Sequence, residues 1–442
     1  MFSKVRTIYK IAPYFRVLFL WMLVISYLIS CSSLDLRPLS SVGTASQEQK
    51  AIENTLSIPS LIHDTSRIRS VQLFRGTPAG VPVITLGSSE TLTLNFDEIA
   101  EQVNMFSVSL SHHNADWTES NLIPAFFMGG FMEDVIQGGT PNMLGYPSFF
   151  SYTYRFPNRD FSVRASGNYQ LHIHDYASRE ILFTLPFIVQ EDRGSLSVRV
   201  EDFFDFRATP KHQIFANYVH PEFIRMPQSD LKFVFTQNQF WGRSVTATEA
   251  DVSTPGQITR HQTREQSFPA RYEFRTLWMD DIQTTTRDII EVRPDARPPL
   301  VRLQFDVVDL DINPRFSRSY RFGEPSTSRN ARYADVEFNL QRPEWIRRNA
   351  EIFVTGSFVN WQIQEEFRME YIHDEDAFRS TGLIKEGRYD YKYVLIENNT
   401  VDVFPLSAFF ADTRQFYQVI IYYHDLQQGY DRVLQFINFE HR

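Results

Sequence analysis

Short runs in which apolar and polar residues alternate constrain the fold of this chain more than any other feature. In TLTLNF, Leu92, Leu94 and Phe96 alternate with polar residues, and MFSVSL repeats the pattern a few residues later. Side chains two apart on a strand point to the same face, so this spacing puts one set into a core and the other towards solvent. Glycine, proline and asparagine separate the runs. The pattern predicts an all-β protein built of β-sandwiches.

The alternating runs fall into three groups, which predict about three tandem immunoglobulin-like β-sandwich domains. The chain is long enough for them at roughly 100 to 200 residues per domain, and its 43% hydrophobic and 15% aromatic residues can fill their cores. A charged turn at residues 191–194 and a polar, turn-rich segment at 317–330 indicate the boundaries. We therefore expect a first sandwich with a long loop at 66–192, a middle sandwich at 193–330 and a C-terminal sandwich at 331–442.

The first residues have the features of an export signal. Basic residues precede an apolar run at 17–29 that is too short to span a bilayer comfortably, as in a secretory signal peptide. Leu28-Ile29-Ser30-Cys31 resembles a bacterial lipobox, and Cys31 is the only cysteine, so the chain cannot form an internal disulfide. We expect a lipoprotein signal peptide at 1–30, acylation of Cys31 and a flexible tether at 31–65. An uncleaved membrane anchor is the alternative.

The charge balance and the motifs exclude several classes of function. A net charge of −9 disfavours a nucleic-acid surface, which needs clustered Lys and Arg. The sequence has no G-x-S-x-G elbow, HExxH pair or phosphate-binding glycine loop. His172 and His174 share a strand face and His112 and His113 could approach them, but a zinc site needs three or four converging ligands. We expect no enzymatic activity, no cofactor, no metal and no small-molecule substrate.

A long irregular segment at 121–146 contains PAFFMGGF and interrupts the strands of the first sandwich. Long loops on a rigid sandwich usually carry binding surfaces. Phe126, Phe127, Met128 and Phe131 either close the end of the sandwich or form a contact patch for a protein partner. Trp117, in HHNADWTES, allows the same two readings: a ring that seals the sandwich, or a partner hot spot.

The C-terminal region contains a second set of candidate residues. VTGSFVNW and EGRYDYKYVL resemble the early-set modules of glycogen-binding and starch-enzyme proteins. In that family a Trp and a Lys, here Trp361 and Lys392, contact sugar. The family's second aromatic platform has no Trp or Tyr here, near 399–401. The resemblance implies an early-set fold for residues 331–442 and, as an alternative function, an outer-membrane lipoprotein that binds glycans.

A second resemblance covers residues 66–442. The blocks HHNADWTES, MGGF, YTYRFPN, SGNYQLHI and LPFIVQED, continued by FVFTQNQFW, YEFRTL and FYQVIIYYHDLQQGYDRV, are similar in order and spacing to the type IX secretion system plug protein family of Bacteroidetes-like bacteria. The resemblance implies a non-enzymatic protein that binds the large outer-membrane β-barrel translocon and seals its periplasmic opening. It also implies an outer-membrane-associated lipoprotein on the periplasmic face. We expect the partner-binding residues to be Phe126, Phe127, Met128, Phe131 and Trp117.

Overall fold

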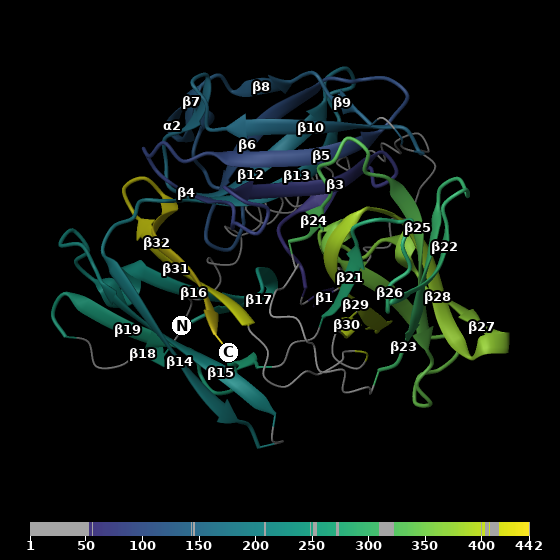
Figure 1. Cartoon of the computed structure of the whole chain (residues 1–442). Helices are drawn as coiled ribbons and strands as arrows, with labels where there is room; N and C mark the ends of the chain where they lie inside the picture. The colour runs from purple at the N-terminus through teal and green to yellow at the C-terminus, as the bar shows by residue number, and fades with distance from the viewer. Residues whose placement is uncertain are drawn as a thin grey trace, which may run out of the picture. The chain divides into compact units, whose positions relative to one another are not determined.

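The computed structural model describes one part of the chain, shown in Figure 1. The chain divides into two units, Met1–Ala51 and Ile52–Arg442, and every described residue belongs to the second unit. The expected signal peptide, Cys31 and most of the expected tether lie outside the described residues. Within those residues, no helix has the length and apolar character needed to cross a membrane. The described residues are 53–54, 56–142, 144, 146–206, 209–247, 249–250, 254–270, 274–308, 322–398, 400–402, 406 and 415–441.

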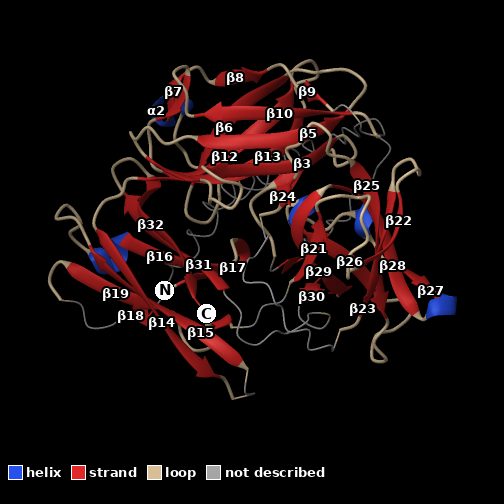
Figure 2. Cartoon of the chain, in the orientation of Figure 1, coloured by secondary structure: helices blue, strands red, loops and turns tan. Residues whose placement is uncertain are grey.

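Strands dominate the described residues, which confirms the expected all-β class (Figure 2). The helical segments are single short turns: α2 (Pro124–Phe127), α3 (Pro227–Asp230), η1 (Ser357–Val359), η2 (Glu365–Phe367) and η3 (His373–Glu375). The strands form several sheets that pack around separate apolar cores, so the described part of the chain is a set of β-sandwiches.

The first sandwich contains the strands β2 (Leu61–Ile62), β3 (Ile68–Arg75), β4 (Val83–Thr85), β5 (Leu92–Ile99), β6 (Phe106–His113), β8 (Glu133–Ile136), β9 (Thr140–Pro141), β10 (Phe149–Phe156), β12 (Gly167–Asp175) and β13 (Ile181–Gln190). One sheet has the order β3-β5-β10-β9, and the other has the order β2-β13-β12-β6-β8 with β4 beside β13. A small pair of strands, β7 (Met128–Gly130) and β11 (Phe161–Val163), lies beside α2 at one end of the sandwich (Figure 1).

The alternation in β5 produces this core as the sequence predicts. Leu92, Leu94 and Phe96 are buried, and the residues between them are partly exposed. The ring of Phe96 stacks on Tyr152 of β10 with centroids 5.0 Å apart, and Phe106 of β6 meets both rings edge-on. Such aromatic pairs add to the free energy gained by burying their apolar area.

The middle sandwich is built from two separate parts of the chain. Its strands are β14 (Ser195–Phe204), β15 (Pro210–Val219), β16 (Leu231–Gln237), β17 (Phe240–Thr246), β18 (Glu249–Ala250), β19 (Gln257–His261), β20 (Phe268–Pro269), β31 (Gln415–Asp425) and β32 (Tyr430–His441). One sheet has the order β14-β15-β19-β18 with β20 beside β15, and the other has the order β17-β16-β31-β32.

Apart from β1, the strands of the third sandwich lie in sequence between β20 and β31. Its strands are β1 (Glu53–Asn54), β21 (Arg275–Met279), β22 (Ile289–Arg293), β23 (Leu300–Asp306), β24 (Glu324–Pro325), β25 (Tyr333–Gln341), β26 (Glu351–Gly356), β27 (Glu370–Ile372), β28 (Ala377–Lys385), β29 (Gly387–Glu397) and β30 (Thr400–Asp402). One sheet has the order β22-β23-β25-β28-β27. In the other, β29 pairs with β21, β24, β26 and β30, and β1 pairs with β30.

This pairing differs from the expected boundary at residue 330. The hairpin β31–β32, expected in the C-terminal sandwich, belongs to the middle one, because β31 pairs with β16 from Leu231↔Tyr423 to Gln237↔Tyr417. Conversely, β21, β22 and β23 lie before residue 330 but complete the sheets of the third sandwich. The expected tether is also shorter than 31–65, since Leu56 and Ile62 are buried in apolar cores.

Candidate functional site

The two histidines that open HHNADWTES are part of the fold. His112 is buried, and its ring lies between the Ser120 hydroxyl at 2.8 Å from Nδ1 and the Ser166 carbonyl at 3.0 Å from Nε2. His113 lies 2.8 Å from the Trp117 carbonyl through Nδ1 and 2.8 Å from Ser111 Oγ through Nε2. Burial lowers the pKa of His112 to about 4, so its imidazole is neutral near pH 7. These rings hold the turn after β6 in place.

The turn that carries Trp117 touches the middle sandwich. The Ala115 amide donates to Asp431 Oδ2 of β32 at 3.1 Å, and the Trp117 ring meets Trp241 of β17 edge-on, with centroids 5.1 Å apart. Trp117 has a φ of 65°, in the left-handed region, and is half-buried. These contacts place Trp117 where two sandwiches meet, and its expected role in partner binding stays a prediction.

The apolar loop residues divide into an inner and an outer pair. Phe127 and Met128 are buried in the core of the first sandwich, where the Phe127 ring lies near His112 and Tyr169. This burial corrects their assignment to a partner-binding set, because neither side chain can reach a partner without leaving the core. Phe126 and Phe131 point outward and are 66% and 68% exposed.

Two glycines fix the backbone between these outer residues. Gly130 has a φ of 83°, and a Cβ there would lie 2.2 Å from the Asp160 carbonyl oxygen. A Cβ at Gly129 would lie 2.4 Å from Ser162 Oγ. The Phe131 amide donates to the Asp160 carbonyl and the Arg164 amide to that of Phe127, so β11 holds the loop on both sides. Phe126 and Phe131 are therefore presented by a fixed frame.

Two more exposed apolar side chains flank the same loop. Ile123 precedes α2 and Met132 follows Phe131, and each is exposed. We call Ile123, Phe126, Phe131 and Met132 the loop patch. The residues predicted from the sequence did not include Ile123 and Met132. Their positions beside Pro124 and beside Phe131, outside any alternating run, were the signal that could have identified them. All four exposed apolar side chains belong to one loop, and exposed apolar side chains that gather on a surface commonly mark a protein or membrane contact.

The candidate sugar-binding residues do not form an exposed platform. Trp361 is 3% exposed and packs edge-on against Phe240 of β17 at 5.2 Å between centroids. Lys392 is 1% exposed, and its Nζ lies 5.7 Å from the centroid of Phe274. A stacking face must be open to the sugar, so this burial corrects the expectation that Trp361 and Lys392 bind glycans. Trp361 instead joins the third sandwich to the middle one through the cluster of Leu56, Phe240, Phe274, Phe353, Trp361, Val394 and Val401.

The histidines of β12 bond to serines across the strand pair. His172 Nε2 lies 2.7 Å from Ser111 Oγ, and His174 Nε2 lies 2.8 Å from Ser109 Oγ. Within the described residues, no group of three metal-ligating side chains includes His112, His113, His172 or His174. The four histidines are therefore hydrogen-bonding residues of β6 and β12.

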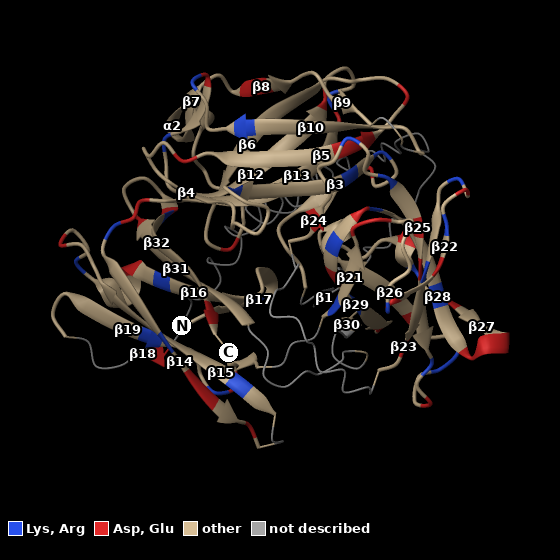
Figure 3. Cartoon of the chain, viewed as in Figure 1, with Lys and Arg blue, Asp and Glu red and all other residues tan. Residues whose placement is uncertain are grey.

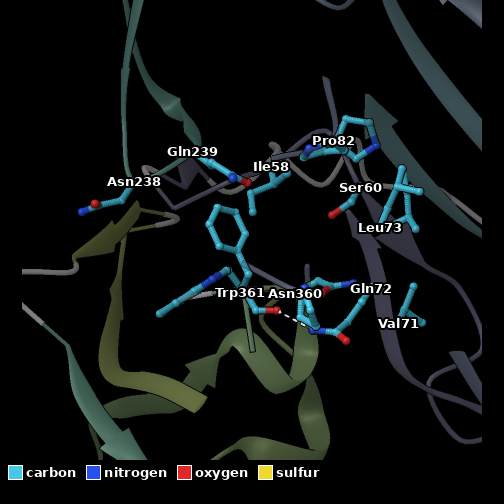
Figure 4. Close-up of a pocket in the computed structure, with 14 residues that line it drawn as sticks. Ile58, Ser60, Val71, Gln72, Leu73, Pro82, Asn238, Gln239, Asn360 and Trp361 are labelled. Atoms are coloured by element: carbon cyan, nitrogen blue, oxygen red, sulfur yellow. Dashed lines mark hydrogen bonds between the residues drawn. The ribbon is translucent and has the colours of Figure 1, made fainter. Parts of the chain in front are cut away.

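A small cleft lies where segments of all three sandwiches meet (Figure 4). Gln72 of β3, Gln239 of the β16–β17 turn and Trp361 line it, and Gln72 Nε2 donates to the Phe322 and Gly323 carbonyls at 3.1 and 2.7 Å. Its volume is about 70 Å³, whereas small-molecule sites usually measure about 300 to 1,000 Å³. The cleft has room for ordered water but not for a substrate of ordinary size.

A partly buried ion pair connects the first and middle sandwiches. Arg432 of β32 donates from Nε and Nη2 to the two oxygens of Glu191, each at 2.7 Å, and Ser166 Oγ donates to the same carboxylate. Burial alone would raise the pKa of Glu191, but the bonds from Arg432 and Ser166 outweigh it and lower the pKa. Elsewhere, acidic and basic residues are intermixed along the strands (Figure 3).

Comparisons with known proteins match this architecture. A family model described as "Type 9 secretion system plug protein 1st domain" matches residues 68–191, which span the first sandwich from β3 to the end of β13. The members of this family are domains of secretion plug proteins, and the family is not a known enzyme family. The search of curated proteins found no match.

One solved structure has the same fold over most of the chain. It is the crystal structure of a hypothetical protein from Parabacteroides merdae, with a TM-score of 0.77 and 22% identity, covering 87% of this chain and 100% of that one. An alkylpurine DNA glycosylase from Pseudomonas fluorescens bound to DNA has a TM-score of 0.18 at 15% identity, covering 28% of this chain and 30% of that one. A TM-score this low carries no argument about fold or function.

Proposed function

Because this chain belongs to the type 9 secretion system plug protein family, whose first domain spans residues 68–191, we propose that it is a non-enzymatic plug of the type IX secretion translocon. In this proposal it binds the large outer-membrane barrel and seals the periplasmic opening. A pore wide enough for folded cargo would otherwise leak solutes while no substrate is present. The observation that carries the proposal is the loop patch, held outward by a fixed frame on the domain that matches the family.

The patch has the composition of a protein-binding centre. Aromatic rings and methionine are enriched at interface cores, where they lose their water on contact. In the sequence, Phe126 and Phe131 flank Phe127 and Met128, which are buried in the core. Because this buried pair anchors the loop, the loop needs little ordering when a partner docks. A preformed surface binds more tightly than a flexible one of equal area, because less conformational entropy is lost.

Stiffness between the sandwiches is the second property that a plug requires. The Glu191–Arg432 pair joins the first and middle sandwiches, and a buried pair between Asp97 and Lys385 joins the first and third. The Tyr422 hydroxyl of the middle sandwich also donates to Asn168 Oδ1 of the first at 2.9 Å. These contacts oppose bending at the junctions between the sandwiches. A plug that bent easily there would not keep the pore closed.

Affinity purification from envelopes solubilised in mild detergent tests the proposal, with the double variant Phe126→Asp/Phe131→Asp beside the wild type. The wild type should bring down a very large outer-membrane barrel, and the double variant should recover at least about tenfold less of it, since two apolar anchors become charged. Both variant positions are exposed, so stability should change by less than about 0.5 kcal/mol.

Phe204→Asp is the matched control, because Phe204 is an equally exposed phenylalanine at the end of β14 in the middle sandwich. It should leave the barrel yield unchanged. Recovery of the wild-type protein without any barrel would argue against the plug itself. Equal yields for the double variant and the wild type would contradict the loop patch as the contact that carries the proposal.

A lipid on Cys31 would keep the plug beside its translocon. Residue 31 lies outside the described residues, and its acylation is proposed from the lipobox-like sequence alone. A tethered domain binds a neighbouring site as if at high local concentration. Replacing Cys31 with serine should therefore move the protein from the outer-membrane fraction to the soluble periplasmic fraction, as measured by sucrose-gradient fractionation. Unchanged membrane fractionation would rule the anchor out.

A further inference from the structure

Three metal-ligating side chains meet at one end of the middle sandwich. Asp202 of β14 and His212 of β15 are direct cross-strand partners, and Asp202 Oδ1 lies 3.3 Å from His212 Nε2. His441, at the end of β32 in the other sheet, places Nε2 2.8 Å from the same Oδ1. One ligand atom from each residue lies within 4.8 Å of the other two. The described residues contain no other group of this kind.

Strand pairing explains why the three residues converge. Val198, Val200 and Asp202 alternate along β14 and pair with Ala216, Ile214 and His212 of β15, so all face the interior of the sandwich. The apolar residues of this face fill the core, but at the pair Asp202–His212 an acid and a histidine replace them. The sandwich is open to solvent there, since the Asp202 side chain is 62% exposed while His212 is buried.

A neighbouring hydroxyl orients the His212 ring. Tyr417 Oη of β31 lies 2.6 Å from His212 Nδ1, and Gln237 Nε2 lies 3.3 Å from the same Oη. When Nδ1 carries the ring proton and donates it to Tyr417, the lone pair of Nε2 points towards Asp202. A metal-binding histidine is commonly held in this way by an outer hydrogen bond on its other nitrogen.

We propose that Asp202, His212 and His441 form a binding site for a divalent transition-metal ion, for which Zn²⁺ is the best fit. Zinc binds imidazole nitrogen and carboxylate oxygen at about 2.0 to 2.2 Å in tetrahedral geometry, which spaces ligand atoms about 3.3 Å apart. The spacings of 3.3 and 2.8 Å to Asp202 Oδ1 are close to that value. The exposed side of Asp202 leaves the fourth position open to water or to a side chain of a partner.

The site would join the two sheets of the middle sandwich. His441 ends the last strand of the chain, and Asp202 lies 239 residues earlier, on the other sheet. Because the ligands converge only in the folded chain, metal binding favours the folded state. The inference does not depend on the plug function, since it concerns a different sandwich and different residues.

Zinc binding to the full untagged chain in detergent tests the inference, measured by competition with a chromogenic chelator. We expect about one Zn²⁺ per wild-type chain. His212→Gln, His441→Gln and Asp202→Asn should each weaken binding at least about tenfold. Zinc should raise the Tm of the wild type but not of these variants.

His424→Gln is the matched control, because His424 Nδ1 pairs with Asp431 Oδ1 at 2.8 Å in the same sandwich, and neither residue belongs to a group of three metal-ligating side chains. It should bind zinc like the wild type. Asp202 and His441 are partly exposed, so their variants keep the test valid if His212→Gln folds poorly. A wild type that binds no zinc, or Asp202→Asn and His441→Gln variants that bind it equally well, would overturn the inference and leave a His–Asp ion pair.

Discussion

Replacing Lys385 with methionine should lower the free energy of unfolding by about 3 to 5 kcal/mol, because it leaves a buried carboxylate without its cation. Lys385 Nζ, at the end of β28, lies 2.7 Å from Asp97 Oδ2 on β5, and the two side chains are 5% and 4% exposed. Ser151 Oγ and Tyr333 Oη also donate to Asp97, at 2.6 and 2.8 Å. Two neutral hydroxyls stabilise a buried carboxylate less than an ammonium group does.

Denaturant titration of the full chain measures the loss of unfolding free energy in Lys385→Met. Two further variants show where that loss comes from. The double variant Asp97→Asn/Lys385→Met should be more stable than Lys385→Met alone, because the unpaired charge is gone. Arg179→Met, which breaks the exposed pair between Arg179 and Glu133, should cost less than about 1 kcal/mol. Equal losses for Lys385→Met and Arg179→Met would show that burial does not determine the value of the Asp97–Lys385 pair.

Replacing Trp361 with alanine should also cost about 3 to 5 kcal/mol, because it opens a cavity in a packed aromatic cluster. The Trp361 ring lies 5.2 Å from Phe240 and 4.9 Å from Phe274, between centroids. Phe240 belongs to the middle sandwich and Trp361 to the third, so the cavity would loosen the junction between them. Thermal unfolding of the variant should start at a lower temperature than that of the wild type.

Trp345→Ala is the matched control in the same sandwich, since the Trp345 side chain is exposed. Its stability should stay within about 0.5 kcal/mol of the wild type. The same two variants also distinguish a structural role of Trp361 from a role in glycan binding. A Trp361→Ala variant that kept wild-type stability but lost binding to insoluble starch would contradict the structural role.

Local pattern could predict the strands but not their partners. The alternation in β5 and β6 follows from side chains that point to opposite faces, which needs no knowledge of the rest of the chain. The pairing of β16 with β31 joins residues that lie about 190 positions apart in the sequence, such as Leu231 and Tyr423. Nothing in the periodicity of β31 distinguishes a partner in the middle sandwich from one in the third. The insertion of the third sandwich therefore appears only in the folded chain.

The candidate residues show the same limit. Phe126, Phe127, Met128 and Phe131 are alike in composition, and only the backbone around the Gly-Gly pair decides which of them are buried. Trp361 fits a sugar-contacting motif, but the residues that cover it, Phe240 and Leu56, come from distant segments. The cluster of Asp202 with His441 likewise depends on a contact across two sheets.

Site-specific photo-cross-linking in cells tests the central claim most directly. A photoreactive phenylalanine analogue is placed at Phe126, at Phe131 and, as the control, at Phe204, which is exposed in the middle sandwich. The plug proposal predicts that the probes at 126 and 131 cross-link to the very large outer-membrane barrel and that the probe at 204 does not. Cross-links from 126 and 131 only to other proteins, or to the barrel no more often than from 204, would contradict it.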